Sequence, residues 1–136
     1  MMTSPQPARP GLRAVIGVIQ EQGRFLVIER ASHIRAGGMI CFPGGGIESG
    51  ESDEAALVRE LFEELGIRVQ AGDRLFQSFN QRGVELNWYA ATIDAGQVIR
   101  PEPTEVASFN WLTRQQMLGL KNLLPSNVEF LEQFQS

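Results

Sequence analysis

The sequence contains only one cysteine, Cys41, among its 136 residues. A single cysteine cannot form an internal disulfide bond, and the chain does not open with the basic and then apolar segments of a secretory signal. No apolar run approaches the roughly 20 residues that a membrane-spanning helix requires. We therefore expect a cytoplasmic protein that does not have a membrane as its partner.

Basic charge is also scarce, because 12 Lys and Arg residues stand against 16 Asp and Glu, for a net charge of −4. Broad binding to nucleic acid needs a face rich in Lys and Arg. We therefore expect no nucleic acid as a partner. This charge does not exclude a single nucleotide whose phosphates arrive together with Mg²⁺.

The composition, 43% hydrophobic and 21% charged, is typical of a globular protein, and the length fits one domain. Residues 1–10 contain three prolines and little apolar content. We interpret them as a flexible leader that precedes a single domain over residues 11–136. No internal repeats are visible in the chain.

Alternating blocks of apolar residues and turn signals predict the order of the secondary structure. Apolar, β-rich segments predict strands over residues 12–19, 25–28, 39–42, 84–93 and 105–112, with a further extended segment after residue 68. A helix is predicted between an N-cap at Ser52 and a C′ glycine at Gly66. Short helices are expected after Thr113 and from Pro125 or Ser126. This order predicts an α+β fold with layers around a mixed β-sheet.

A glycine-rich segment, Phe42-Pro43-Gly44-Gly45-Gly46, leads into the predicted helix. We interpret it as a loop and not as a strand or helix, because Pro lacks an N–H donor and consecutive glycines leave the backbone free to adopt positive φ. Such a loop brings bare main chain close to a ligand or a metal.

The helix carries Glu60, Glu63 and Glu64, whose spacing places three carboxylates on one side. One interpretation is a solvated face, as for most charged helical residues. Like charges at this spacing disfavour a helix by a few tenths of a kcal/mol per pair, so three together beside folded structure call for a counter-charge. Mg²⁺ takes oxygen ligands jointly from carboxylates and substrate phosphates. A divalent-metal site is therefore the leading hypothesis.

The same helix has apolar residues on its opposite side, which predict a buried face. They are Leu57, Val58, Leu61, Phe62 and Leu65.

Together these residues resemble the complete Nudix box. Gly45 is followed after five residues by Glu51, after seven more by Arg59-Glu60-Leu61, and then, one residue apart each time, by Glu63-Glu64 and Gly66-Ile67. The resemblance to Nudix hydrolases implies an α/β/α sandwich around a mixed sheet. It also implies a loop–helix–loop metal site that hydrolyses nucleoside diphosphates linked to another group.

The resemblance implies that Mg²⁺, for which Mn²⁺ can substitute, is held by Glu60, Glu63 and Glu64, with the main-chain carbonyl of Gly45 as a further ligand. Glu105 precedes the last strand, where relatives place an extra metal-binding glutamate. It is the best candidate for a general base outside the box, and a solvated loop carboxylate is the alternative.

Arg59 and Glu51 match the Arg and first Glu of the family, which support the ligands. The guanidinium can pair with Glu51 across the loop or with Glu63 one turn on. Which residue is the base stays open, with Glu60 expected to be either a ligand or the base. The residues expected to take part in catalysis are Glu51, Arg59, Glu60, Glu63 and Glu105.

Beyond the box, three residues resemble the substrate pocket of MutT-type nucleoside triphosphate pyrophosphohydrolases. Arg30 lies twelve residues before Phe42 and is either a phosphate contact or an ordinary charge at a strand end. Phe42 is either a pocket residue or a core residue. Asn127, in a Pro-x-Asn segment, either binds the base edge or caps a helix. His33, in the loop after the second strand, is either a surface residue or a substrate contact.

We therefore predict a Mg²⁺-dependent hydrolase that converts a nucleoside triphosphate to a monophosphate and pyrophosphate. Oxidised purine nucleotides are among the substrates considered, although residues 78–85 lack an Asp-Arg pair like the one MutT uses for base recognition. ADP-ribose or a nucleotide sugar is the alternative substrate, and a non-catalytic nucleotide-binding module is the alternative of another class. Dimers are common among relatives, so a homodimer stays open.

Overall fold

The computed structural model describes residues 12–134, so the leader predicted for residues 1–10 lies outside the described residues. The elements are β1 Arg13–Val18, β2 Gln20–Glu21, β3 Arg24–Arg30, β4 Ile40–Cys41, β5 Gly44–Gly46, α1 Asp53–Leu65, β6 Val69–Phe79, β7 Glu85–Ile93, β8 Val106–Leu112, α2 Arg114–Leu118 and α3 Pro125–Gln133. The predicted strands and helices are all present, most of them with ends that differ by one or two residues. None of the helices in residues 12–134 is both long and apolar enough to cross a membrane.

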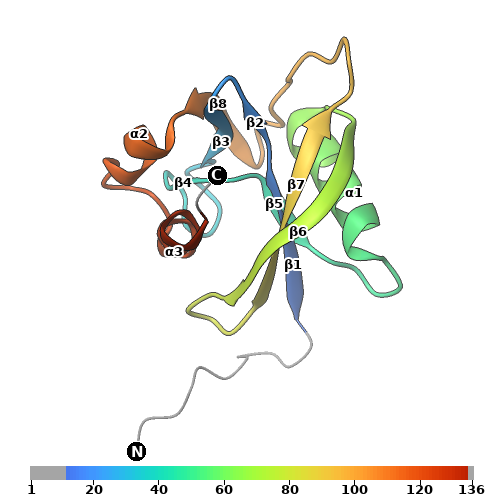
Figure 1. Ribbon diagram of the computed structural model, residues 1–136, viewed down its shortest axis with the longest axis horizontal. Coiled ribbons are helices and arrows are strands. Elements are labelled where there is room, and N and C mark those ends of the chain that lie inside the picture. Colours follow the sequence, from blue (N-terminus) through green and yellow to red (C-terminus); the bar gives the residue numbers. More distant parts are fainter. Residues whose placement is uncertain (1–11, 135–136) are drawn as a thin grey trace, which may run out of the picture.

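The strands form a mixed sheet and an antiparallel sheet. The mixed sheet has the order β5-β1-β7-β6, in which β1 and β7 are parallel and the other pairs are antiparallel. In the second sheet β3 pairs with β2, β4 and β8. Helix α1 lies on one side of the strands, and α2 and α3 lie on the other (Figure 1). The α+β prediction is confirmed, with the strands divided between two sheets.

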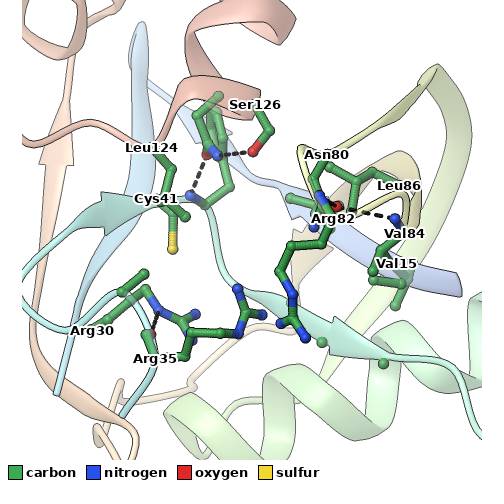
Figure 2. A pocket seen from close by; sticks show the side chains of 18 of the residues that line it. Val15, Arg30, Arg35, Cys41, Asn80, Arg82, Val84, Leu86, Leu124 and Ser126 are labelled. Atoms are coloured by element: carbon green, nitrogen blue, oxygen red, sulfur yellow. Dashed lines mark hydrogen bonds between the residues drawn. The ribbon is translucent and has the colours of Figure 1, made fainter. Parts of the chain in front are cut away.

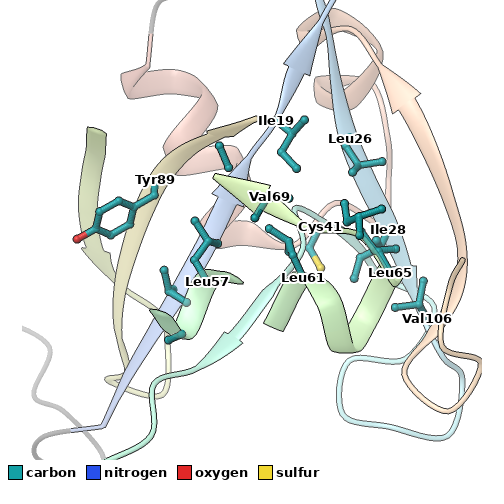
Figure 3. Close-up of a cluster of buried hydrophobic side chains, with 14 residues drawn as sticks. Ile19, Leu26, Ile28, Cys41, Leu57, Leu61, Leu65, Val69, Tyr89 and Val106 are labelled. Carbon is teal, nitrogen blue, oxygen red and sulfur yellow. The ribbon is translucent and has the colours of Figure 1, made fainter. Parts of the chain in front are cut away.

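Two hydrophobic cores fill the space between these layers, and β3 contributes to both. Leu26 and Ile28 belong to the core beneath α1, shown in Figure 3. Phe25 and Val27 point the other way, into the core beside α2 and α3. Successive side chains of a strand face opposite sides. The continuous apolar run of β3 is therefore explained by burial on both faces.

An aromatic cluster in the second core fixes Phe42, two residues before the first glycine of β5. Phe42, only 3% exposed, meets Phe25, Trp88 and Phe130 edge-on, at ring-centroid distances of 5.4, 6.0 and 5.5 Å. Edge-to-face contacts at such distances are favourable beyond simple area burial. The start of the glycine segment is thus anchored in the core.

The prediction that the glycine segment forms no strand is wrong. Gly44–Gly46 form β5 and pair antiparallel with β1, with Gly45 opposite Val15. None of these three glycines has positive φ. A Cβ on Gly44 would lie 2.1 Å from the carbonyl oxygen of Val15. Glycine is needed here for close approach of main chain, and not for a left-handed conformation.

Helix α1 begins and ends as predicted, because the Ser52 hydroxyl accepts from the Ala55 N–H and Gly66 adopts a left-handed φ of 65°. Its buried face differs from the prediction. Leu61 is fully buried, whereas Val58 and Phe62 are 37% and 49% exposed. The correct buried set is Ala56, Leu57, Leu61, Glu64 and Leu65. The apolar spacing predicts one wide buried arc, but the sheet covers a narrower stripe of the helix that includes Glu64.

This correction can be tested by comparing two truncations on α1. We expect Leu61→Ala to lower the free energy of unfolding by about 2–5 kcal/mol, because it leaves a cavity under the helix. We expect Val58→Ala to change it by less than about 0.5 kcal/mol, because the Val58 side chain faces water. Urea denaturation of both variants measures the difference, and equal losses would contradict the observed helix orientation.

Candidate functional site

A pocket of about 610 Å³ lies between the two sheets and the start of α3. Its lining comes from β1, β5, α1, the loop after β3, the turn between β6 and β7, and the segment before and at the start of α3. Figure 2 shows the part of the lining around Cys41, Arg82 and Leu124. The volume falls in the range of small-molecule and cofactor sites, roughly 300–1,000 Å³. We therefore treat this pocket as the candidate site.

Arg59 connects the parts of the box, as the sequence predicts. Its Nε and Nη2 donate to the two carboxylate oxygens of Glu51, at 2.6 and 2.8 Å. Its Nη1 donates to Glu60 at 2.8 Å and to Glu63 at 3.2 Å, and Nη2 also reaches the Gly46 carbonyl oxygen at 2.9 Å. A planar guanidinium suits this forked arrangement. Arg59 thereby ties the helix to the segment that precedes it.

Glu51 is held as a carboxylate by this contact. The Arg59 hydrogen bond, followed by the main-chain N–H of Glu48, lowers the pKa of Glu51 to about 2. A carboxylate that accepts such bonds stays ionised well below its ordinary range. Glu51 is therefore ionised at neutral pH and paired with Arg59.

Glu64 is a buried carboxyl group at one end of the pocket, 4% exposed. It accepts a hydrogen bond from the Gly44 N–H at 3.0 Å and forms no ion pair within residues 12–134. Burial, with the neighbouring Glu60 charge second, raises the pKa of Glu64 to about 8. Burial also raises the pKa of Glu60, against the opposing hydrogen bond from Arg59. Two carboxyl groups with raised pKa values thus lie together, and of the two only Glu60 has a cationic partner, Arg59, in the described part of the chain.

The donors at this end of the pocket fit a hard divalent cation. A Cβ on Gly45 would lie 2.2 Å from Oε1 of Glu60, so only a glycine lets the main chain come this close to the carboxylate. The described residues contain no group of three His, Cys, Asp or Glu side chains that could hold a metal as they stand. Glu60 and Glu63 instead accept hydrogen bonds from Arg59.

The predicted ligands are only partly brought together. Gly45, Glu60, Glu64 and Glu105 line the same pocket. Glu105 is close enough for its charge to raise the pKa of both Glu60 and Glu64. Glu63 does not line the pocket, and its side chain is 49% exposed. Helical spacing alone could not separate Glu63 from Glu64, because both lie one turn from Glu60.

Two of the predicted substrate residues have structural partners of their own. Arg30 lines the pocket, and its Nε donates to the main-chain oxygen of Arg35 at 2.9 Å. The Asn127 carboxamide oxygen accepts from the Phe42 N–H at 2.8 Å, and its Nδ2 donates to the Ser126 hydroxyl at 3.1 Å. Asn127 is therefore committed to joining α3 to the segment before β5.

Phe42 is a core residue by its packing, although it also lines the pocket. His33 is exposed and is not part of the lining. Two arginines that the motif did not single out, Arg35 and Arg82, do line it. Arg82 stands in the turn between β6 and β7, within the segment that lacks an Asp-Arg pair. Arg35 lies in the loop between β3 and β4.

This chain matches one protein-family model and is similar in sequence to several known proteins. The NUDIX domain model matches residues 9–134. The chain is 28% identical over 135 residues to the CTP pyrophosphohydrolase of Escherichia coli (strain K12), covering 90% of each protein. It is 37% identical over 82 residues to the 8-oxo-dGTP diphosphatase of the same organism, covering 57% of this chain and 63% of that protein.

The fold also matches solved structures. The MutT protein from Methanosarcina mazei Go1 superposes with a TM-score of 0.75 at 24% identity, covering 96% of this chain and 94% of that chain. The match extends beyond the box into both sheets and the helices of the opposite layer. Motif, fold and relatives agree, and the chain belongs to the NUDIX domain family as a MutT-like Nudix hydrolase.

Proposed function

We propose that this hydrolase uses Mg²⁺, replaceable by Mn²⁺, to cleave a nucleoside triphosphate into a nucleoside monophosphate and pyrophosphate. The observation that carries the proposal is the meeting of two carboxyl groups, Glu60 and Glu64, with bare glycine main chain at one end of a pocket. Such an end suits a cation that bridges to phosphate oxygens.

The chain would supply the ligands and the orientation. When bound, a divalent cation neutralises phosphate charge and lowers the pKa of bound water. Glu60 and Glu64, with the Gly45 carbonyl, would hold it, and Glu63 remains a predicted ligand whose side chain would have to turn inward. Arg59 would keep Glu60 oriented through the 2.8 Å contact.

One residue must take a proton from the attacking water while the bond between the α- and β-phosphates breaks. Glu105 is our choice for this base. It lines the pocket together with Glu60 and Glu64, and its carboxylate forms no ion pair within residues 12–134. A box glutamate is the alternative, but Glu60 is already held by Arg59.

The names of the relatives support a triphosphate as substrate, since one is a CTP pyrophosphohydrolase and another an 8-oxo-dGTP diphosphatase. The nucleobase of the substrate remains open. The Asn127 carboxamide oxygen is already used by the Phe42 N–H, so only a remaining Nδ2–H could reach an acceptor on the base. An oxidised purine is therefore one member of a substrate panel and not the expected answer.

The test is a panel of ordinary and oxidised nucleoside triphosphates, ADP-ribose and nucleotide sugars, with chromatographic identification of every product. We expect a monophosphate and pyrophosphate from at least one triphosphate, with Mg²⁺ present and not with EDTA. Turnover restricted to ADP-ribose or a nucleotide sugar would replace the proposed substrate class. Tight binding without any product would favour the non-catalytic module.

We further propose the cytoplasm as its place of action. Cys41 is a buried thiol, and burial raises its pKa to about 12. A thiol of this kind forms no disulfide and suits a reducing compartment. A homodimer stays a prediction that the molecular mass in solution would test.

Glu64→Gln tests the proposed metal end. The amide oxygen can still accept from the Gly44 N–H, so we expect the fold to be retained while a ligand charge is lost. We expect kcat/KM to fall at least about 100-fold. Glu54→Gln, on the exposed first turn of the same helix, is the matched control and should keep wild-type activity. Wild-type activity in Glu64→Gln would remove Glu64 from the site.

Glu105→Gln tests the proposed base. We expect kcat to fall about 100-fold to 10,000-fold, the usual contribution of general base catalysis. The fall should shrink as the pH rises, because hydroxide then replaces the missing base. A pH profile of kcat for both proteins makes the comparison. An unchanged kcat would show that Glu105 is not the general base and would favour a glutamate of the Nudix box in that role.

Removal of the metal should be visible in stability as well as in activity. A ligand that binds only the folded state adds about 2.7 kcal/mol at 100 times its Kd. For a chain of this size we expect Mg²⁺ or Mn²⁺ to raise Tm by roughly 5–10 °C over EDTA. Differential scanning fluorimetry would measure it. The rise should disappear in Glu64→Gln and persist in Glu54→Gln, and an equal rise in both would contradict the assignment.

A further inference from the structure

Two arginines that the box does not include face each other across the pocket. Arg35 lies in the loop after β3, and Arg82 lies in the turn between β6 and β7. Figure 2 shows their side chains reaching toward each other, away from Leu124 and Ser126 at the α3 end. Loops from two different sheets thus bring two guanidinium groups to one place.

Neither guanidinium has an acidic partner in the part of the chain that the structure describes. Within residues 12–134 the arginine ion pairs involve only Arg13 and Arg59. Partial burial, followed by the charges of Arg82 and Arg30, lowers the pKa of Arg35. Like charges that converge without a counter-ion destabilise the folded protein, so an anion between them would be favourable.

The Arg35 loop is a defined structure. The Arg30 Nε donates a hydrogen bond to the main-chain oxygen of Arg35 at 2.9 Å. The Gly38 N–H donates to the main-chain oxygen of Arg30, also at 2.9 Å. Ala36 has a φ of 57°, a left-handed conformation that a non-glycine residue adopts only when its surroundings impose it. Arg30 therefore positions Arg35 in addition to lining the pocket.

The Arg82 turn is equally defined. The Asn80 carboxamide oxygen accepts from the N–H groups of Arg82 and Val84, at 2.9 and 3.0 Å. Gly83 follows with a φ of 79°, which glycine tolerates without strain. Both arginines therefore project from loops whose backbones are held by hydrogen bonds of their own.

The pocket thus has carboxyl groups of α1 at one end and two arginines on loops that face each other across it. A divalent cation held by Glu60 and Glu64 would neutralise the charge of two phosphate groups of a substrate. The third phosphate of a nucleoside triphosphate is a further anion, whereas a nucleotide sugar carries an uncharged sugar at that position. Guanidinium forks bind phosphate oxygens in pairs.

From this arrangement we propose that Arg35 and Arg82 form a two-loop clamp for the phosphate beyond the scissile bond, and that the clamp selects triphosphates over sugar-linked diphosphates. The proposal rests on the proposed function and names what decides its substrate class. Arg35 and Arg82 are positioning and specificity residues in it, and proton transfer is left to the glutamates.

Binding of an inorganic anion tests the clamp without turnover. Metal-free protein in EDTA is titrated calorimetrically with inorganic tripolyphosphate and with pyrophosphate. We expect Arg35→Gln and Arg82→Gln each to weaken tripolyphosphate binding about tenfold or more, the usual effect of losing a charge-assisted contact. Arg35→Lys and Arg82→Lys should fall between wild type and the Gln variants, because they keep the charge and lose the fork.

Arg24→Gln is the matched control, because Arg24 is an exposed arginine at the start of β3 that does not line the pocket. It should bind tripolyphosphate as the wild type does. Equal affinity for tripolyphosphate in the control and in both clamp variants would overturn the proposal. An equal loss of affinity in all three variants would also overturn it, because the loss would then follow from the change in net charge alone. Thermal melts of each variant establish that it is folded.

The substrate preference provides the second measurement. The selectivity is the kcat/KM for a nucleoside triphosphate divided by the kcat/KM for a nucleotide sugar. With metal present, this ratio should fall about tenfold or more in the clamp variants, mainly because the KM for the triphosphate rises. An unchanged ratio would overturn the selective role. A wild-type protein that cleaves neither substrate but binds tripolyphosphate through these arginines would instead contradict the proposed hydrolysis, so the two failures are distinguishable.

Discussion

The site depends on the close approach of glycine main chain to the carboxyl groups of α1. Gly44 donates its N–H to Glu64, and Gly45 leaves no room for a side chain beside Glu60. The approach is possible because β5 pairs with β1 while Phe42, just before it, is held in the aromatic core. Sheet register and core packing thereby set the distance between backbone and carboxylate.

Arg59 reduces the repulsion between the glutamates that this arrangement brings together. Several glutamates close together would repel one another, and the guanidinium reduces that repulsion for Glu60, Glu63 and Glu51 at once. Glu64 remains outside its reach and is buried with a raised pKa. Glu64 is buried without a cationic partner among the described residues, so a bound cation would stabilise its ionised form.

Local patterns in the sequence were sufficient for the helix, its caps and the Arg59 contacts, because these involve residues within about twenty positions of one another. The strand formed by Gly44–Gly46 was not predictable in the same way, since its pairing partner Val15 lies far away in the chain. The exposure of Phe62 and Val58 also depends on which part of the helix the sheet covers. Apolar spacing defines a face and not its width.

The arginines illustrate the same limit at the level of function. Arg35 and Arg82 lie 47 positions apart in the sequence and stand on connections between strands, so no motif joins them. They come together because β3 and β6 belong to different sheets whose loops meet over one pocket. A box defined on one helix can therefore fix the chemistry of the phosphate bond, while the choice of substrate lies in loops that only the assembled fold brings together.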